Sequence, residues 1–282
     1  MHTETVDLDL SGREAFYLCG LLQGVRLLDI DPSVSPAAQM EQDESLVRRE
    51  IELSLRDKGY ITLAEDGIVA VDVTAAALMS VVAFPHVTFG IVGVGTGGDA
   101  NRVAYHLQDT LAVEVHRETG TSYRLTALER KDIARHIHDR WAPGDLGAPP
   151  GEHRPLPERV LQTVRWLALQ MRSEHDARLA LEGVGLPAAM AASIARTVAR
   201  PRNSGGMIAI RPDATGGEQA GELAMLSGED GTWLFRRLST TQAGQVDVVP
   251  CAAPDLMLAL RHFVGHYCLN GEQPSSDVPD LS

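Results

Sequence analysis

The chain has 282 residues, of which 44% are apolar and 22% are charged, and its formal net charge at pH 7 is −13. This composition is typical of a globular protein, and the length suits one large domain or two of ordinary size. The acidic balance argues against a general nucleic-acid partner, because there is no basic surplus to displace the counterions of a phosphate backbone.

Cysteine usage and the absence of long apolar runs indicate the compartment. Cys19, Cys251 and Cys268 form no Cys-x-x-Cys pair and cannot all be paired within one chain, which favours a reducing environment. The first residues, His2-Thr3-Glu4, are unlike the basic start of a secretory signal, and no run of eighteen apolar residues occurs. We therefore expect a cytoplasmic protein without membrane insertion.

The first part of the chain predicts a strand followed by helices. Residues 5–10 alternate like an edge strand, and Ser11 with Glu14 predicts a capping box at the start of a helix. The elements expected after that helix are a helix at 44–58, a hairpin over 61–71 and a helix at 74–83.

A pattern of strands and a closing helix at residues 85–141 returns at 201–263. The predicted strands of the two copies are 87–92, 103–107, 111–116 and 122–126, then 207–210, 222–226, 232–238 and 246–249. The predicted closing helices run from Leu128 to about Arg140 and from about Pro254 to Tyr267. The same order of elements in both places indicates duplication of one α/β unit.

The composition between the two copies predicts a linker. Residues 142–157 hold five prolines and three glycines. We therefore predict a first half at 1–141 and a second half at 158–282. The second half is expected to begin with helices at 158–172, 175–184 and 188–199.

The predicted fold class is α+β. We expect a duplicated helix–sheet–helix unit with pseudo-twofold symmetry, in which helices flank a central, mostly antiparallel sheet. A three- or four-stranded sheet has two edges that pairing would protect, so the halves are expected to join as one globular unit.

Two helices followed by a hairpin also match the order of a winged helix-turn-helix. A DNA-reading helix needs exposed Arg, Lys, Asn or Gln near its start. Residues 74–82 contain none of these and are mainly apolar. DNA binding is therefore disfavoured.

A glycine-rich segment keeps one enzymatic alternative open. Gly93–Gly98 fits the spacing Gly-x-Gly-x-x-Gly after a predicted strand, and Glu114 or Glu118 lies at the distance expected of a ribose-binding carboxylate. A dinucleotide site would need a helix after this loop, whereas residues 101–107 have strand spacing. A glycine-rich turn is favoured, and a nucleotide- or NAD(P)-dependent enzyme is the alternative function.

Histidines at helical spacing raise the question of a metal. His262 and His266 lie at i and i+4 on the last predicted helix, and His136 and His138 lie on the equivalent helix. Two histidines at this spacing can share a metal ion, but a zinc protease would need Glu after the first of them. An amphipathic helix surface is favoured, and no metal site is predicted.

Other catalytic signatures are missing from the sequence. There is no Gly-x-Ser-x-Gly elbow and no Gly-x-x-x-x-Gly-Lys-Ser/Thr phosphate loop. Asp29 and Asp31 could in principle do acid–base work, but their proline-containing segment is typical of a solvated turn. The sequence therefore predicts no enzyme, no catalytic residue and no cofactor.

The predicted strand 232–238 offers an apolar surface for a partner. Alternation places Trp233 and Phe235 on one face and Leu234 and Leu238 on the other. A sheet covered by helices on one side needs only one apolar face. Because this strand is apolar on both faces, something must cover the second face. Helices of the other half are the simplest cover. A second subunit or a client protein would make these four residues the partner-binding site.

Several short motifs, taken in order, are similar to those of one known family. The motifs are Leu53–Tyr60, Glu65–Val69, Ala83–Pro85, Leu181–Leu186, Ser204–Ile208 and Gly231–Trp233. In this order, and in its length and two-copy plan, the chain resembles the EspG family of cytosolic chaperones associated with type VII (ESX) secretion.

The resemblance implies a quasi-twofold α+β fold without a catalytic site or cofactor. It also implies binding to the tip of a helical PE–PPE-like secretion substrate. No binding residue is carried over, because the family has no short binding motif to match. We therefore expect a non-enzymatic cytoplasmic chaperone or adaptor that binds an apolar helical surface of a secreted partner. Partner contacts are expected at Trp233, Leu234, Phe235 and Leu238.

Overall fold

The computed structural model describes residues 6–24, 27, 44–64, 68–94, 100–118, 120–141, 147–212, 217–238 and 242–268. These residues belong to two compact units. The first unit contains Met1–Gly90 and Arg102–Ile133, and the second contains Ile91–Asn101 and Ala134–Ser282.

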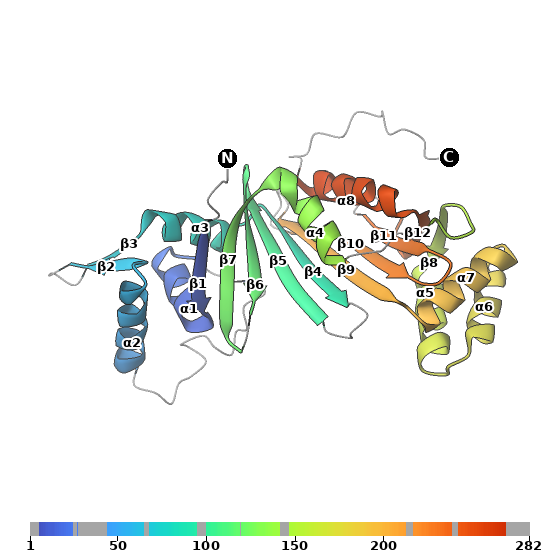
Figure 1. Cartoon of the computed structure of the whole chain (residues 1–282), viewed down its shortest axis with the longest axis horizontal. Coiled ribbons are helices and arrows are strands. Elements are labelled where there is room, and N and C mark those ends of the chain that lie inside the picture. The colour runs from blue at the N-terminus through green and yellow to red at the C-terminus, as the bar shows by residue number, and fades with distance from the viewer. Residues whose placement is uncertain are drawn as a thin grey trace. The chain divides into compact units, whose positions relative to one another are not determined.

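Ten strands of the described chain form one sheet, in the order β1-β7-β6-β5-β4-β9-β10-β11-β12-β8. Helices flank this sheet, and the α+β class predicted from the sequence is confirmed (Figure 1). The order of elements is also repeated along the chain. In both repeats one strand precedes three helices, four consecutive strands and a closing helix.

The two repeats have closely similar elements. The first contains β1 (Asp7–Ser11), α1 (Gly12–Leu21), α2 (Glu44–Asp57), α3 (Val73–Ala83), β4 (Val87–Val94), β5 (Ala100–Gln108), β6 (Leu111–Arg117), β7 (Ser122–Glu129) and α4 (Ile133–Trp141). The second contains β8 (Arg154–Pro157), α5 (Glu158–Leu169), α6 (Glu174–Glu182), α7 (Ala188–Ala199), β9 (Asn203–Pro212), β10 (Glu218–Ser227), β11 (Thr232–Arg237), β12 (Gln245–Cys251) and α8 (Ala253–Cys268). The first repeat also has an inserted hairpin of β2 (Ile61–Leu63) and β3 (Val69–Val71).

The first unit buries one face of its strands under α1, α2 and α3. Leu8 and Leu10 of β1 point into this core, while Asp7 and Asp9 are exposed, as expected of an edge strand. The predicted capping box at Ser11 is confirmed, because its hydroxyl accepts from the Glu14 amide and the Glu14 carboxylate accepts from the Ser11 amide.

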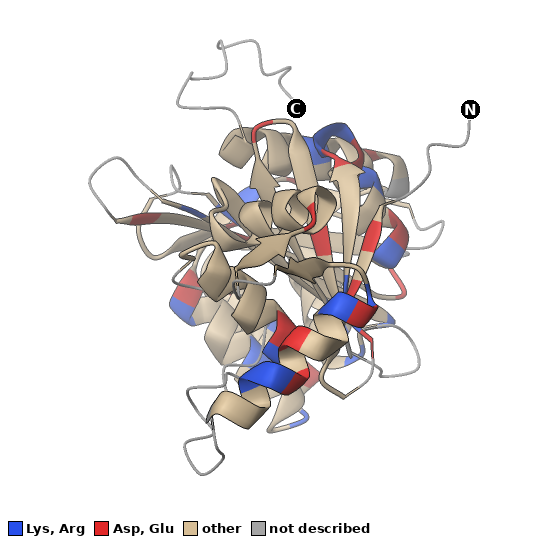
Figure 2. Cartoon of the chain, turned by 90° about the vertical axis from the view of Figure 1, so that its left-hand side faces the viewer, with Lys and Arg blue, Asp and Glu red and all other residues tan. Residues whose placement is uncertain are grey.

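Helix α2 is amphipathic. Val47, Ile51 and Leu55 are buried in the core, and acidic and basic residues are interleaved along the rest of the helix (Figure 2). This pattern explains how a helix with so many charges still packs against α1.

The second unit covers both faces of its strands with helices. Trp233, Val248 and Leu156 form one core with residues of α5, α6 and α7. On the opposite face, Tyr267 of α8 lies against Gly221 of β10, where an added Cβ would come within 1.8 Å of the tyrosine hydroxyl oxygen. Glycine at this position allows α8 to approach the sheet closely.

The predicted start of the first closing helix is wrong. A helix was expected from Leu128, but β7 continues to Glu129, a 3-10 turn covers Arg130–Asp132, and α4 begins at Ile133. Strand pairing explains the difference, because Leu128 lies opposite Ala112, and Glu129 lies opposite Leu111 of β6. Tertiary pairing here overrides residues that individually favour helix.

Most described residues of the predicted linker at 142–157 are exposed, but the segment contacts the second unit closely at some points. Pro149 is buried, and an added Cβ at Gly231 would lie 2.3 Å from the Gly147 carbonyl oxygen. The last residues, Arg154–Pro157, form β8, which pairs with β12 at the edge of the sheet. The segment thus ends inside the second repeat, while the boundary between the predicted halves stays a prediction.

None of the described helices combines the length and apolar character that crossing a bilayer requires.

Candidate partner-binding surface

The structure places the four predicted partner-binding residues at different depths. Trp233 and Leu234 are 0% and 3% exposed, whereas Phe235 and Leu238 are half-buried. The side chains of Trp233 and Leu234 are therefore buried within the chain, although α7, which covers Trp233, belongs to the same predicted half rather than to the other one. Only Phe235 and Leu238 could contact a partner directly, and partner binding by any of the four stays a prediction.

The face of the sheet that carries Trp233 can be followed across neighbouring strands. Trp233 lies opposite Leu226 of β10, and Phe235 lies opposite Ala224. Two residues further along, Arg237 lies opposite Glu222. Trp233 is covered by α7, because its indole Nε1 donates to Ser193 Oγ at 3.1 Å. Phe235 and Arg237 are only half-buried, so the helical cover ends along this face.

Apolar side chains continue this face beyond the helices. Ile208 of β9 lies opposite Glu222 and is 48% exposed, and Val92 of β4 is 39% exposed. Gly93 and Gly205 both face Trp141 of α4, so Val92 and Ile208 point away from α4 by strand alternation.

We call this part of the second unit the open face. It consists of Val92, Ile208, Ile210, Ala220, Glu222, Phe235 and Arg237. Each of these residues is exposed or half-buried. Five of the seven are apolar, and an apolar patch on a sheet face is typical of an interaction surface.

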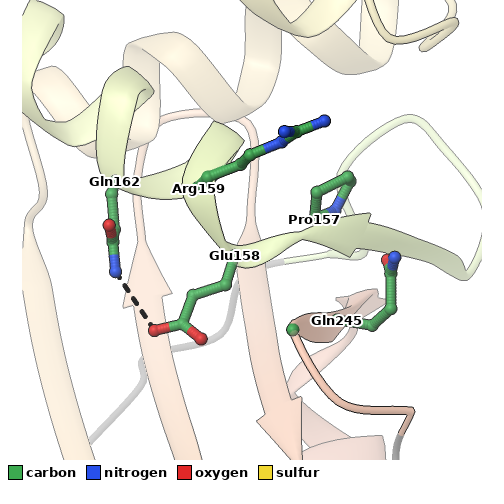
Figure 3. A pocket seen from close by; sticks show the side chains of 6 residues that line it. Pro157, Glu158, Arg159, Gln162 and Gln245 are labelled. Carbon is green, nitrogen blue, oxygen red and sulfur yellow. Dashed lines mark hydrogen bonds between the residues drawn. The ribbon is translucent and has the colours of Figure 1, made fainter.

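An ion-pair group forms the charged part of the open face. Arg237 Nη2 lies 2.5 Å from Glu222 Oε1, and Arg237 Nη1 lies 3.1 Å from Glu158 Oε2 at the start of α5. Gln162 donates to the other oxygen of Glu158 at 3.1 Å (Figure 3). One guanidinium thus serves two carboxylates, and the group keeps one negative charge in excess.

A hollow of about 470 Å³ lies beside this group, at the start of α5 (Figure 3). Its lining residues are Pro157, Glu158, Arg159, Gln162, Gly244 and Gln245. Pockets for small organic ligands are lined mainly by apolar and aromatic side chains, whereas four of the six residues that line this hollow are polar or charged. The hollow therefore resembles a polar rim of the open face more than a ligand pocket.

The described residues on both sides of the glycine-rich segment belong to strands. Gly93 lies within strand β4, and Gly95–Gly98 fall outside the described residues. The next element along the chain is strand β5, beginning at Ala100, rather than a helix. The segment therefore does not lead into the helix N-terminus that would hold a pyrophosphate.

The two histidine pairs lie on the closing helices α8 and α4. His262 is exposed and His266 is half-buried on α8. Burial lowers the pKa of His266, and the charges of Arg211 and Arg236 lower it further. Among the described residues, no three His, Cys, Asp or Glu side chains are grouped so that they could hold a metal ion.

Two other sets of candidate residues were considered from the sequence. His136 and His138 are half-buried on α4. Asp29 and Asp31 lie outside the described residues.

Sequence reasoning missed Val92 and Ile208. A signal for Ile208 was present, because Met207-Ile208-Ala209-Ile210 is apolar at every position. Only one face of a half-covered strand is buried, so the other apolar face remains exposed. Met207 and Ala209 are buried, whereas Ile208 is exposed. An apolar run on both faces of a strand therefore indicates a second contact surface.

Comparison with known proteins shows the fold. No family model matches the chain, and no curated protein sequence matches it. Among solved structures, it is similar to the type VII secretion system chaperone EspG5 of Mycobacterium tuberculosis, solved in complex with the PE25–PPE41 dimer. The two share 15% identity over 91% of this chain and 95% of EspG5, with a TM-score of 0.64.

A second structure, HtdX of Mycobacterium tuberculosis, aligns over 88% of this chain and 99% of that one at 13% identity, but its TM-score of 0.16 carries no argument. The similarity to EspG5 shows the architecture of this chain. Its function has to be argued from the residues on its surface. The chain thus has an EspG-like α+β fold.

Proposed function

We propose that this protein is a non-enzymatic cytoplasmic chaperone or adaptor that covers an apolar helical surface of a secreted partner, such as a PE–PPE-like or other ESX substrate. The observation that carries the proposal is the open face, where apolar side chains of β4, β9 and β11 remain partly exposed beyond the helices that cover the same sheet. The EspG-like fold supports it, because EspG5 was solved with a PE25–PPE41 dimer.

Burial of the open face would supply the binding energy. Complete burial of an Ile or Phe side chain is worth about 1.5–3 kcal/mol, so covering the half-exposed Ile208 would contribute roughly 1 kcal/mol. Phe235 and Val92 would add similar amounts, and polar groups around them would form a rim. In this arrangement Trp233 and Leu234 act by holding β11 in place rather than by touching the partner.

The test is capture of a defined partner by variants of the open face. The tagged protein is produced together with a PE–PPE pair from the same source, and the amount of the pair that co-purifies is measured. Ile208→Lys and Val92→Asp should each reduce capture at least tenfold, because each places a charge in an apolar contact.

The matched control is Leu258→Lys, since Leu258 is 38% exposed on α8 and lies away from the open face. Circular dichroism establishes that each variant is folded. Equal capture by folded Ile208→Lys, Val92→Asp and the parent protein would show that the open face does not bind the partner.

A further inference from the structure

We infer that the open face selects a partner helix that carries a lysine or arginine at the edge of its apolar stripe, placed next to Glu222 and Glu158. This inference rests on the proposed function and names the chemistry of the partner that fits the same surface.

The first argument is the unequal charge of the ion-pair group. Arg237 is shared between two carboxylates, at 2.5 Å from Glu222 and 3.1 Å from Glu158. The side chains of Glu222, Arg237 and Glu158 are 49%, 38% and 38% exposed, so a partner can reach all three. A second cation would complete this group, whereas a second anion would meet an excess of like charge.

The second argument is the position of the carboxylates beside apolar residues. Glu222 lies in one row with Ile208 on one side and Arg237 on the other. The next row contains Phe235 and Ala224. A lysine or arginine can lay its apolar stem along Ile208 while its charged end reaches Glu222. The same row thus accepts the apolar and the basic part of one partner residue.

The helix that already covers the neighbouring part of this face indicates that the partner is helical as well. Helix α7 packs on the same strands at the Trp233 end, where Ser193 accepts the hydrogen bond of the indole. A partner helix on the open face would continue this helix-on-sheet layer. Its apolar residues would follow the spacing i, i+3, i+4 and i+7.

Charge also distinguishes this occupant from two others. A second copy of the chain would bring a net charge of −13 and the same acidic group to the contact. The C-terminal residues 269–282 contain Glu272, Asp277 and Asp280 but no lysine or arginine. Both would place like charges against Glu222 and Glu158, so a separate basic helix is the better fit.

The test uses three synthetic amphipathic peptides of roughly 18 residues, long enough for about five helical turns. They share one leucine stripe and differ at a single flanking position, which is lysine, glutamine or glutamate. Binding to the full-length protein is measured by fluorescence anisotropy at about 50 mM and about 500 mM NaCl, because exposed ion pairs are screened by salt.

At the lower salt concentration, the lysine peptide should bind about tenfold more tightly than the glutamate peptide, and the difference should shrink at the higher concentration. In the double variant Glu158→Gln/Glu222→Gln, the preference should reverse, because Arg237 is then the remaining charge of the group. Glu182→Gln is the control, since Glu182 is ion-paired to Arg178 on α6 instead.

Each result bears on a different statement. Equal affinity for the three peptides, with binding lost in Ile208→Lys, would overturn the charge selection and leave the proposed function standing. Absence of binding by every peptide up to about 1 mM, where even weak specific contacts are detected, would overturn both. A dimer in sedimentation that Ile208→Lys dissociates would identify a second copy as the occupant and would also overturn the inference.

Discussion

The indole Nε1 of Trp233 donates a hydrogen bond to Ser193 Oγ at 3.1 Å, and both side chains are buried in the second unit. This bond ties strand β11 to helix α7 at the place where the helical cover of the sheet ends. Trp233 is the largest fully buried side chain among the described residues, and this bond satisfies its one polar atom.

We expect Ser193→Ala to lower the free energy of unfolding by about 1–2 kcal/mol, because the indole N–H would remain buried without an acceptor. Urea unfolding followed by circular dichroism measures the change. Thr163→Ala is the control, since the exposed Thr163 hydroxyl only donates to the Arg159 carbonyl of its own helix. A change within about 0.5 kcal/mol is expected there, and equal losses in the two variants would argue against the role of the buried bond.

Gly221→Ala should destabilise the protein by about 2–3 kcal/mol through overpacking against α8. The new Cβ would lie 1.8 Å from the hydroxyl oxygen and 2.5 Å from Cζ of Tyr267. Thermal unfolding measures the loss. Gly206→Ala is the control on the neighbouring strand, because an added Cβ there meets nothing within 4 Å.

The clash at Gly221 also predicts a specific rescue. Removing only the hydroxyl in Tyr267→Phe should help little, because ring atoms of Tyr267 also lie within 3 Å of the new Cβ. Tyr267→Leu should recover part of the loss when combined with Gly221→Ala, giving a coupling energy of at least about 1 kcal/mol in a double-mutant cycle. Purely additive effects would show that the two residues are not in contact.

Glu14 of α1 should stabilise the first unit in a pH-dependent way. Burial raises the pKa of this carboxyl, but hydrogen bonds from Lys58, Ser11 and Ser54 outweigh it and hold the pKa below its usual value of 4.5. The folded-state pKa is thus below the unfolded one, so the stabilisation is present above the unfolded pKa and is lost as pH falls through the folded pKa.

Glu14→Gln should therefore cost about 1–2 kcal/mol at pH 7, where it breaks the 2.8 Å ion pair with the partly exposed Lys58. The difference from the parent protein should shrink as pH is lowered below about 4.5. Urea unfolding at several pH values measures this. A difference that stays constant with pH would contradict the linkage of Glu14 to folding.

His106 of β5 should make the protein less stable in mild acid. Its side chain is fully buried, its Nδ1 lies 3.1 Å from Thr88 Oγ1, and burial lowers its pKa from 6.5 to about 4. The unfolded chain binds the proton more strongly, so stability is complete above about pH 6.5 and falls as pH decreases towards 4. At pH 5 the loss should be about 2 kcal/mol.

Replacing this histidine separates its contribution from those of other groups. His106→Leu should remove the decrease in melting temperature between pH 6.5 and 5, whereas His262→Gln on the exposed surface of α8 should retain it. Parallel decreases in the parent protein and in His106→Leu would assign the acid sensitivity to other residues.

Local patterns were sufficient for most elements of the fold. The helix predicted at 188–199 coincides with α7 because Pro187 marks its start and apolar residues recur at helical spacing. The repeated order of strands and closing helices also followed from periodicity. Leu128 and Glu129 could not be assigned this way, because their strand state depends on pairing with β6 rather than on their own propensities.

The candidate surface was only partly accessible to sequence reasoning. Alternation correctly separated Trp233 from Leu234, but the burial of Trp233 and Phe235 depends on where α7 ends over the sheet. Val92 has no special sequence signal of exposure, and the ion-pair group joins residues 79 and 15 positions apart in the chain. Such long-range contacts arise from strand register, which single-sequence patterns do not determine.

The two outer strands of the sheet restrict how any other chain can approach. Strand β1 exposes the carboxylates of Asp7 and Asp9, and two of the four residues of β8, Pro155 and Pro157, lack a backbone N–H. Neither border is suited to receive an additional strand from another molecule. Growth of this ten-stranded sheet into filaments is disfavoured for the same reason, and side chains rather than main-chain hydrogen bonds are suited to association at its borders.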